Sequence, residues 1–113
     1  MLTSKVALAA GIALGLAAGA ASAQQVDGDA QAARSKISMC IGCHGIKGYH
    51  TAYPQVYHVP KIAGQQPAYI VNALKEYKSG ERSHPSMRGI AGSLSDKDMA
   101  DLAAYYSSEG GKK

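Results

Sequence analysis

Apolar residues recur at helical spacing in the segment between Pro67 and Gly80. Ile70, Leu74 and Tyr77 stand at positions i, i+4 and i+7, which places them on one face of a helix. Proline suits the first turn of a helix, and glycine is typical of the position where a helix ends. The pattern therefore predicts a helix that begins at Pro67 and ends before Gly80.

A second helix is predicted near the C-terminus. Ser95 is a favourable N-cap, and Asp98, three positions later, resembles the partner residue of a capping box. Gly110 and Gly111 are expected to stop this helix. Its inward-facing stripe consists of Met99, Leu102 and Tyr106, with Ala103 beside them.

The rest of the chain has a weaker pattern. Residues 29–39 predict a first helix, whose apolar face consists of Ala30, Ala33 and Ile37. Glycine and proline interrupt residues 42–64 and 79–94, which predicts two irregular segments. The first of these is long and rich in apolar and aromatic residues, which is typical of a functional wrapping segment and not of an idle linker.

The N-terminus has the pattern of a secretory signal peptide. Lys5 precedes an unbroken run of Ala, Leu and Gly, and Ala21-Ser22-Ala23 fits a small-x-small cleavage site. The run is shorter than the roughly 20 residues that cross a bilayer. We therefore expect residues 1–23 to be cleaved, residues 24–113 to form one domain, and the mature chain to be periplasmic without a permanent membrane anchor.

Composition limits how such a chain can build its core. It contains seven tyrosines but no phenylalanine or tryptophan, and a domain of this size buries only a modest core. A large apolar cofactor would supply the missing bulk. The net charge of +4 includes no basic run beyond Lys112-Lys113, so we expect no nucleic-acid partner.

The strongest chemical signal is the C-x-x-C-H motif formed by Cys40, Cys43 and His44, which contains the only two cysteines of the chain. Two thiols at this spacing can bond to the two vinyl groups of one haem, and the adjacent histidine then ligates its iron. A redox-active dithiol, a structural zinc site and a simple disulfide are the alternatives. None of them requires a histidine at position 44, so we expect one covalent haem c per chain.

The second axial ligand has more than one candidate. Met39 precedes the attachment motif and would have to reach the iron from the same side as His44, while Met99 lies on the apolar stripe of a helix, where methionine usually fills a core. Met87 lies in a segment with the Gly and Pro content of a loop, which favours it as the iron ligand. The histidine alternatives are His50, His58 and His84.

These motifs occur in an order that resembles a class I monohaem cytochrome c, nearest to the small bacterial c4/c-553 type. The matching stretches are residues 40–45 with Gly48, residues 60–65, Tyr69, residues 78–82, Met87, residues 94–98 and residues 102–106. The resemblance implies an all-α fold of about three helices and long loops wrapped around one haem. It also implies that the backbone carbonyl of Pro60 accepts a hydrogen bond from His44, and that Met87 ligates the iron.

The function implied by this resemblance is that of a soluble one-electron carrier, not an enzyme, which meets larger redox proteins as a monomer. The alternatives are a haem subunit of a periplasmic dehydrogenase or oxidase complex, and an open-site haem enzyme or gas sensor. Residues 49–59 depart from the family in being longer and rich in Tyr and His. Four cations are expected near the haem edge, namely Lys47, Lys61, Arg82 and Arg88. They either steer acidic partners toward the haem or are ordinary solvated charges.

Overall fold

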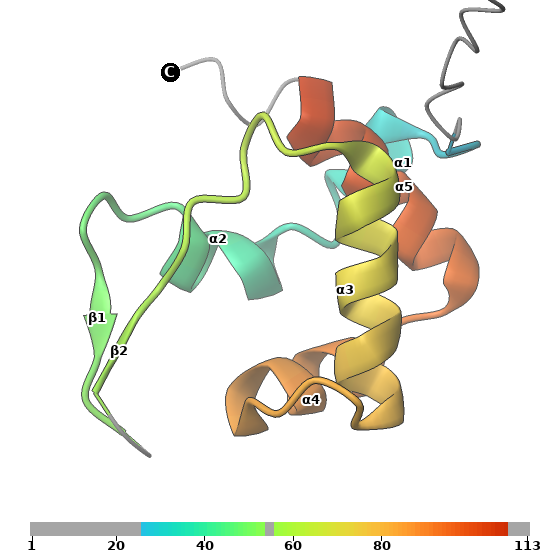
Figure 1. Ribbon diagram of the computed structural model, residues 1–113. Helices are drawn as coiled ribbons and strands as arrows, with labels where there is room; N and C mark the ends of the chain where they lie inside the picture. Colours follow the sequence, from blue (N-terminus) through green and yellow to red (C-terminus); the bar gives the residue numbers. More distant parts are fainter. Residues whose placement is uncertain (1–25, 54–55, 109–113) are drawn as a thin grey trace, which may run out of the picture.

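The computed structural model describes residues 26–53 and 56–108 (Figure 1). The predicted signal peptide, residues 1–23, and the helix stop at Gly110-Gly111 lie outside this part of the chain. Within the described part, no helix is both long enough and apolar enough to cross a membrane.

The described residues form five helices and one short hairpin, so the all-α prediction is confirmed, although there are more helices than the three expected. In chain order the elements are α1 (Ala30–Ala33), α2 (Ser38–His44), β1 (His50–Thr51), β2 (Tyr57–His58), α3 (Pro67–Ser79), α4 (Pro85–Gly92) and α5 (Asp96–Ser108). Helix α5 packs against α1 and α3, and α3 packs against α4. The hairpin and α2 lie to one side of this group (Figure 1).

The predicted first helix over residues 29–39 is interrupted, which is a correction. Helix α1 ends at Ala33, a turn follows, and α2 begins at Ser38. In the turn, the Ala33 carbonyl accepts hydrogen bonds from the backbone N–H groups of Lys36 and Ile37 at 2.8 and 3.1 Å. The break gives α2 its own direction, so that it is not a continuation of α1.

The two helices with the clearest sequence signals are confirmed. Helix α3 spans Pro67–Ser79, and Gly80 ends it in the left-handed conformation, with φ of 89°. At the start of α5 the capping box is reciprocal. The Ser95 N–H donates to an Asp98 carboxylate oxygen at 2.9 Å, and the Asp98 N–H donates to the Ser95 hydroxyl at 3.1 Å.

The prediction that residues 79–94 are irregular is wrong, because they contain helix α4. Pro85 stands in its first turn, and the His84 side chain accepts a hydrogen bond from the Met87 N–H at 3.4 Å. Ala91 and Leu94 are buried. Because these residues follow Met87 and Ile90 at helical spacing, the apolar period was present in the sequence, but Gly89 and Gly92 made it resemble a loop.

The prediction that residues 42–64 are irregular throughout is also wrong. Strands β1 and β2 pair antiparallel, with His50 opposite His58 and Thr51 opposite Tyr57. Each strand is two residues long, which is too short for the alternation of apolar and polar residues to reveal it. Residues 42–44 belong to α2, and the other described residues of the segment outside the two strands form no helix or strand.

The core is small and lies where α1, α3 and α5 meet. It is built from Ala33, Ile70, Leu94, Met99, Leu102, Ala103 and Tyr106. Met99 is fully buried, which confirms that it fills the core, as its place on the helix stripe predicted. Leu74, another predicted stripe residue, packs against this cluster from a partly buried position.

One charged side chain is buried beside this core. The Asp101 carboxylate, 2% exposed, accepts hydrogen bonds from the Lys97 ammonium at 2.7 Å and from the Asp29 backbone N–H at 2.9 Å. The ammonium group of Lys36 forms ion pairs with Asp101, at 3.5 Å, and with Asp98. These contacts attach the start of α1 to the middle of α5. They also hold the pKa of Asp101 below its usual range, mainly through the hydrogen bond from Lys97.

We expect Asp101→Asn to lower the free energy of unfolding of the haem-loaded protein by about 2 kcal/mol, because it leaves a buried hydrogen-bond network incompletely paired. A carboxylate with a depressed folded pKa stabilises the fold above its unfolded pKa, and this contribution is lost as the pH falls. The difference between wild type and variant should therefore shrink below about pH 4. Urea unfolding at several pH values measures it, and a pH-independent difference would contradict the assignment.

Candidate functional site

A mainly apolar cavity lies between α2, the hairpin, α3 and α4. These elements come from different parts of the chain (Figure 1). The apolar side chains in its wall include Val59, Ile62, Ile70, Leu74, Ile90 and Leu94. The cavity therefore brings together three segments that are far apart in the sequence, namely residues 40–44, 57–62 and 84–90.

Helix α2 brings the whole C-x-x-C-H motif to this cavity. Cys40, Cys43 and His44 stand at i, i+3 and i+4, which are neighbouring positions on one helix face, and all three line the cavity. The motif forms most of α2, with His44 as the last helical residue. Burial raises the pKa of the Cys40 thiol.

The ring of His44 is fixed by the backbone of Pro60. Its Nδ1 atom lies 2.7 Å from the Pro60 carbonyl oxygen. Because a carbonyl can only accept, Nδ1 donates its proton, and the lone pair of the neutral ring is then on Nε2. This is how a backbone carbonyl typically orients a metal-ligating histidine. The predicted contact between Pro60 and His44 is observed, and its role toward the iron remains a prediction.

The structure separates the candidates for the second axial position. Met87, Met39 and His84 line the cavity, whereas Met99, His50 and His58 do not. Met87 stands in the first turn of α4. The expectation that it lies in a loop, which came from the Gly and Pro content of the segment, is therefore wrong, but its place at the helix end still lets it line the cavity.

His84 is already engaged by its own helix. Its Nδ1 accepts the hydrogen bond from the Met87 N–H, and its ring contacts Tyr57 edge-on, with the ring centres 4.7 Å apart. When Nδ1 accepts, the proton of the neutral ring is on Nε2, so neither nitrogen offers a free lone pair. This arrangement disfavours His84 as an iron ligand.

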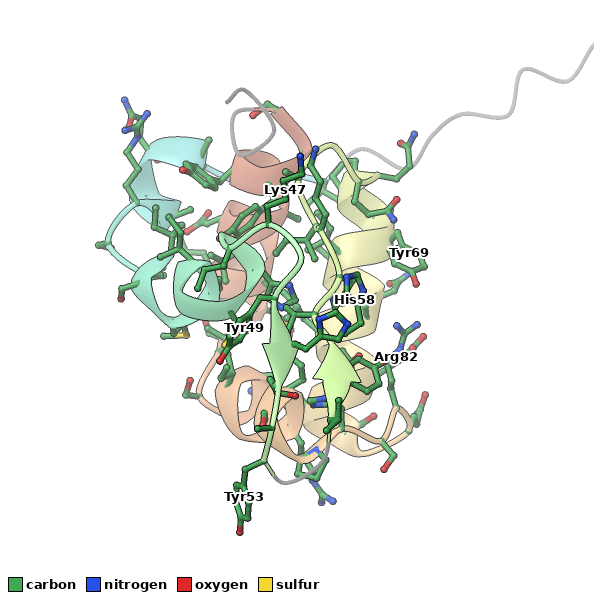
Figure 2. All side chains as sticks on the ribbon, turned by 90° about the vertical axis from the view of Figure 1, so that its left-hand side faces the viewer. Lys47, Tyr49, Tyr53, His58, Tyr69 and Arg82 are labelled. Carbon is green, nitrogen blue, oxygen red and sulfur yellow. The ribbon has the colours of Figure 1, made fainter. Side chains whose placement is uncertain are left out.

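A cation lies in the cavity wall between aromatic rings. The Arg82 guanidinium is 5.7 Å from the centre of the Tyr69 ring and 5.4 Å from that of Tyr77, and its Nε donates to the Glu76 carboxylate at 3.1 Å. All but Glu76 line the cavity. Hydrogen bonds to the tyrosine hydroxyls raise the pKa of Arg82, and the bond to Tyr69 has the largest effect. Figure 2 shows Tyr69 and Arg82 on the same side of the molecule.

The four predicted cations do not form one group. Arg82 and Lys61 line the cavity, whereas Lys47 and Arg88 do not. Lys47 lies on the loop after α2, near the top of the view in Figure 2. Sequence reasoning treated Arg82 as a surface charge and missed its aromatic neighbours. The available signal was the placement of Tyr69 and Tyr77 on α3, eight positions apart and thus roughly two turns from each other.

The residues in the cavity wall fit a haem group. A porphyrin is a flat apolar ring with two carboxylate groups, and the wall combines apolar side chains with the paired thiols, His44, Met87 and two cations. In addition, the Tyr106 hydroxyl is buried without a hydrogen-bond partner among the described residues, although its side chain lines the cavity. Burial raises the pKa of this phenol.

Comparison with known proteins agrees with this geometry. The family model described as cytochrome c matches residues 30–108. The chain is 41% identical over 85 residues to cytochrome c-554(548) of Halomonas halodenitrificans, covering 73% of this chain and 98% of the relative. It is 39% identical over 82 residues to cytochrome c4 of Pseudomonas aeruginosa, covering 73% of this chain but only 39% of that relative.

A further relative is named for its partner. The chain is 34% identical over 76 residues to the thiosulfate dehydrogenase electron acceptor of Thiomonas intermedia, which covers 67% of this chain and 34% of the relative. The chain thus spans less than half the length of the cytochrome c4 and electron-acceptor relatives, and nearly the whole of the c-554(548) relative.

If Cys40 and Cys43 each supply one thioether, we expect Cys43→Ala to retain haem through a single bond. One vinyl group then stays conjugated with the ring, so the alkaline pyridine haemochrome band should move to longer wavelength. Ile41→Ala, which changes a residue between the two cysteines, is the control and should keep the wild-type band. A Cys43→Ala protein with an unshifted band would contradict the assignment.

Proposed function

This chain belongs to the cytochrome c family, and we propose that it is a soluble periplasmic one-electron carrier whose haem iron is ligated by His44 and Met87. As a member of the family it carries one covalent haem c. The haem supplies an iron that alternates between the ferric and ferrous states. The polypeptide attaches the group, fixes the two iron ligands and limits the access of water.

The observation that carries this proposal is that His44 and Met87 line the same cavity as both cysteines. His44 is oriented by Pro60 and keeps its Nε2 lone pair available. Met87 reaches the same cavity from α4. If His44 and Met87 both held the iron, oxygen and peroxide would have no free site there, which would favour electron transfer over chemistry at the iron.

The choice of Met87 also rests on what disfavours its rivals. Met39 belongs to the same helix as His44, so the two residues approach from one side. His84 uses its Nδ1 to cap α4. A thioether stabilises ferrous iron more than a second imidazole does and raises the reduction potential.

The exposed surface around the cavity suits brief encounters with other redox proteins. Tyr69 and Tyr57 are 50% and 45% exposed, and both line the cavity, as does the exposed Lys61. Apolar contact at the cavity mouth with cations near it favours a fast, salt-sensitive encounter. One relative is named a thiosulfate dehydrogenase electron acceptor, and we propose that this chain likewise receives electrons from an oxidoreductase.

The second candidate is a haem subunit that stays bound to its enzyme. Gel filtration of the native protein from its source distinguishes the two. A free carrier elutes at the mass of a single haem-loaded chain or a small oligomer, whereas a subunit elutes with its catalytic partner.

We expect Met87→Ala to abolish the far-red band that arises from charge transfer between thioether sulfur and ferric iron, to lower the reduction potential, and to allow carbon monoxide to bind the ferrous form. Met39→Ala is the control and should keep the band. Absorption spectroscopy of both variants measures the effect. If Met87→Ala retains the band, the ligand assignment fails and with it the carrier mechanism.

We expect Arg82→Gln to lower the reduction potential, because a cation in the cavity wall disfavours the extra positive charge of ferric iron and can pair with a haem carboxylate. A change of about 1 kcal/mol corresponds to a shift on the order of 40 mV for one electron. Arg82→Lys should shift the potential less. Arg88→Gln removes the same charge outside the cavity wall and is the matched control in a potentiometric titration. Equal shifts in the two glutamine variants would show that Arg82 has no special role.

A further inference from the structure

The hairpin brings two histidines together outside the haem site. His50 in β1 and His58 in β2 are direct partners across the strands, and the centres of their imidazole rings are 4.7 Å apart. Both residues are exposed, and neither lines the cavity. Figure 2 shows His58 on the side of the hairpin that faces the viewer.

The hydrogen bonds of the hairpin indicate that His50 and His58 form a non-hydrogen-bonded pair, the kind of antiparallel pair in which the two side chains lie closer together. The Val59 N–H donates to the Tyr49 carbonyl at 2.9 Å, so Tyr49 and Val59 form a hydrogen-bonded pair. Such pairs alternate with non-hydrogen-bonded pairs, in which the side chains approach more closely. His50 and His58 are the next pair along and are therefore of the close kind.

The His50 ring is held in a tautomer suited to binding a metal. Its Nδ1 lies 3.0 Å from the Gly48 carbonyl oxygen, which can only accept, so Nδ1 carries the proton and Nε2 keeps its lone pair. The same arrangement, a carbonyl holding Nδ1, orients His44 at the haem site.

The ring separation matches two ligands of one ion. A metal lies about 2.0 Å from a ligating imidazole nitrogen and hence about 3.2 Å from the centre of that ring. Two ring centres 4.7 Å apart then subtend an angle of about 95° at a shared ion. This is close to the right angle between neighbouring ligands in tetragonal copper(II) and narrower than the tetrahedral angle that zinc prefers.

We propose that His50 and His58 form a surface site for a divalent copper ion, bound through one nitrogen of each ring. Within the described residues, no group of three or more His, Cys, Asp or Glu side chains gathers around a common point, so the remaining positions of the ion are those of water or of a ligand from outside. Copper(II) also forms the strongest nitrogen complexes among the divalent first-row ions. The site is thus open and exchangeable.

Copper binding at this pair ties together two strands of two residues each. The adjacent pair, Thr51 and Tyr57, lines the cavity. An ion that bridges β1 and β2 therefore makes this wall of the cavity more rigid. Copper binding at the hairpin requires neither the iron ligands nor the carrier function.

The test is titration of the ferric haem-loaded protein with Cu²⁺, followed by calorimetry and by electron paramagnetic resonance. Ferric protein is used so that copper has no electron to accept. We expect one Cu²⁺ per chain with hyperfine coupling from two nitrogens, and at least tenfold weaker binding for both His50→Gln and His58→Gln. Unchanged haem absorption confirms that the variants fold around their cofactor.

A variant with the same number of histidines serves as the matched control. His58→Gln combined with Gln31→His moves one imidazole to an exposed position on α1, so it should bind Cu²⁺ no better than His58→Gln alone. Hydrogen exchange of the hairpin amides should slow on copper addition in wild type only. Wild-type affinity in the double variant, or binding by wild type that shows coupling to a single nitrogen, would overturn the proposal.

Discussion

The constraint on which the structure depends is the shortage of large apolar side chains. The core at α1, α3 and α5 contains seven residues, of which two are alanines, and its largest fully buried apolar side chains are Met99 and Leu102. Several other apolar residues of α3 and α4, among them Leu74 and Ile90, face a cavity. A chain without Phe or Trp thus leaves part of its apolar surface facing a space that a non-protein partner would fill. Haem c would fill this role, and burial of its apolar ring against these side chains would complete the hydrophobic core.

Attachment and ligation are coupled through short local devices. Helix α2 puts both thiols and His44 on one face, and the Pro60 carbonyl then fixes the imidazole from a different part of the chain. At α4 the His84 ring caps the helix turn that carries Met87. The imidazole of His44 is thus positioned by a loop carbonyl, whereas the turn of Met87 is capped at a helix N-terminus, where backbone N–H groups are free to donate. Arg82, held by Tyr69, Tyr77 and Glu76, adds a fixed positive charge to the same cavity wall.

The two residue pairs of the hairpin differ in their surroundings. Its inner positions, Thr51 and Tyr57, belong to the cavity wall, and its other pair, His50 and His58, lies outside it. Because neighbouring residues of a strand point to opposite faces, one short element serves the cofactor on one side and presents two imidazoles to solvent on the other. Of the Tyr- and His-rich residues 49–59, which depart from the family resemblance, Tyr57 thus faces the cavity, whereas His50 and His58 do not.

Short-range sequence patterns were enough to predict two of the helices and the haem attachment motif. Periodicity and caps defined α3 and α5, including the reciprocal bonds of Ser95 and Asp98, because these interactions join residues a few positions apart. The spacing of Cys40, Cys43 and His44 likewise indicated covalent haem, since both the chemistry and the geometry are contained in one helix turn.

Tertiary structure decided what depends on distant partners. Glycines concealed α4, which is stabilised by packing against α3, and strands of two residues left no periodic trace of the hairpin. The aromatic neighbours of Arg82 and the pairing of His50 with His58 depend on how the chain folds back on itself. The cost of closing such loops is recovered only by contacts made in the folded state, so no short stretch of sequence specifies them.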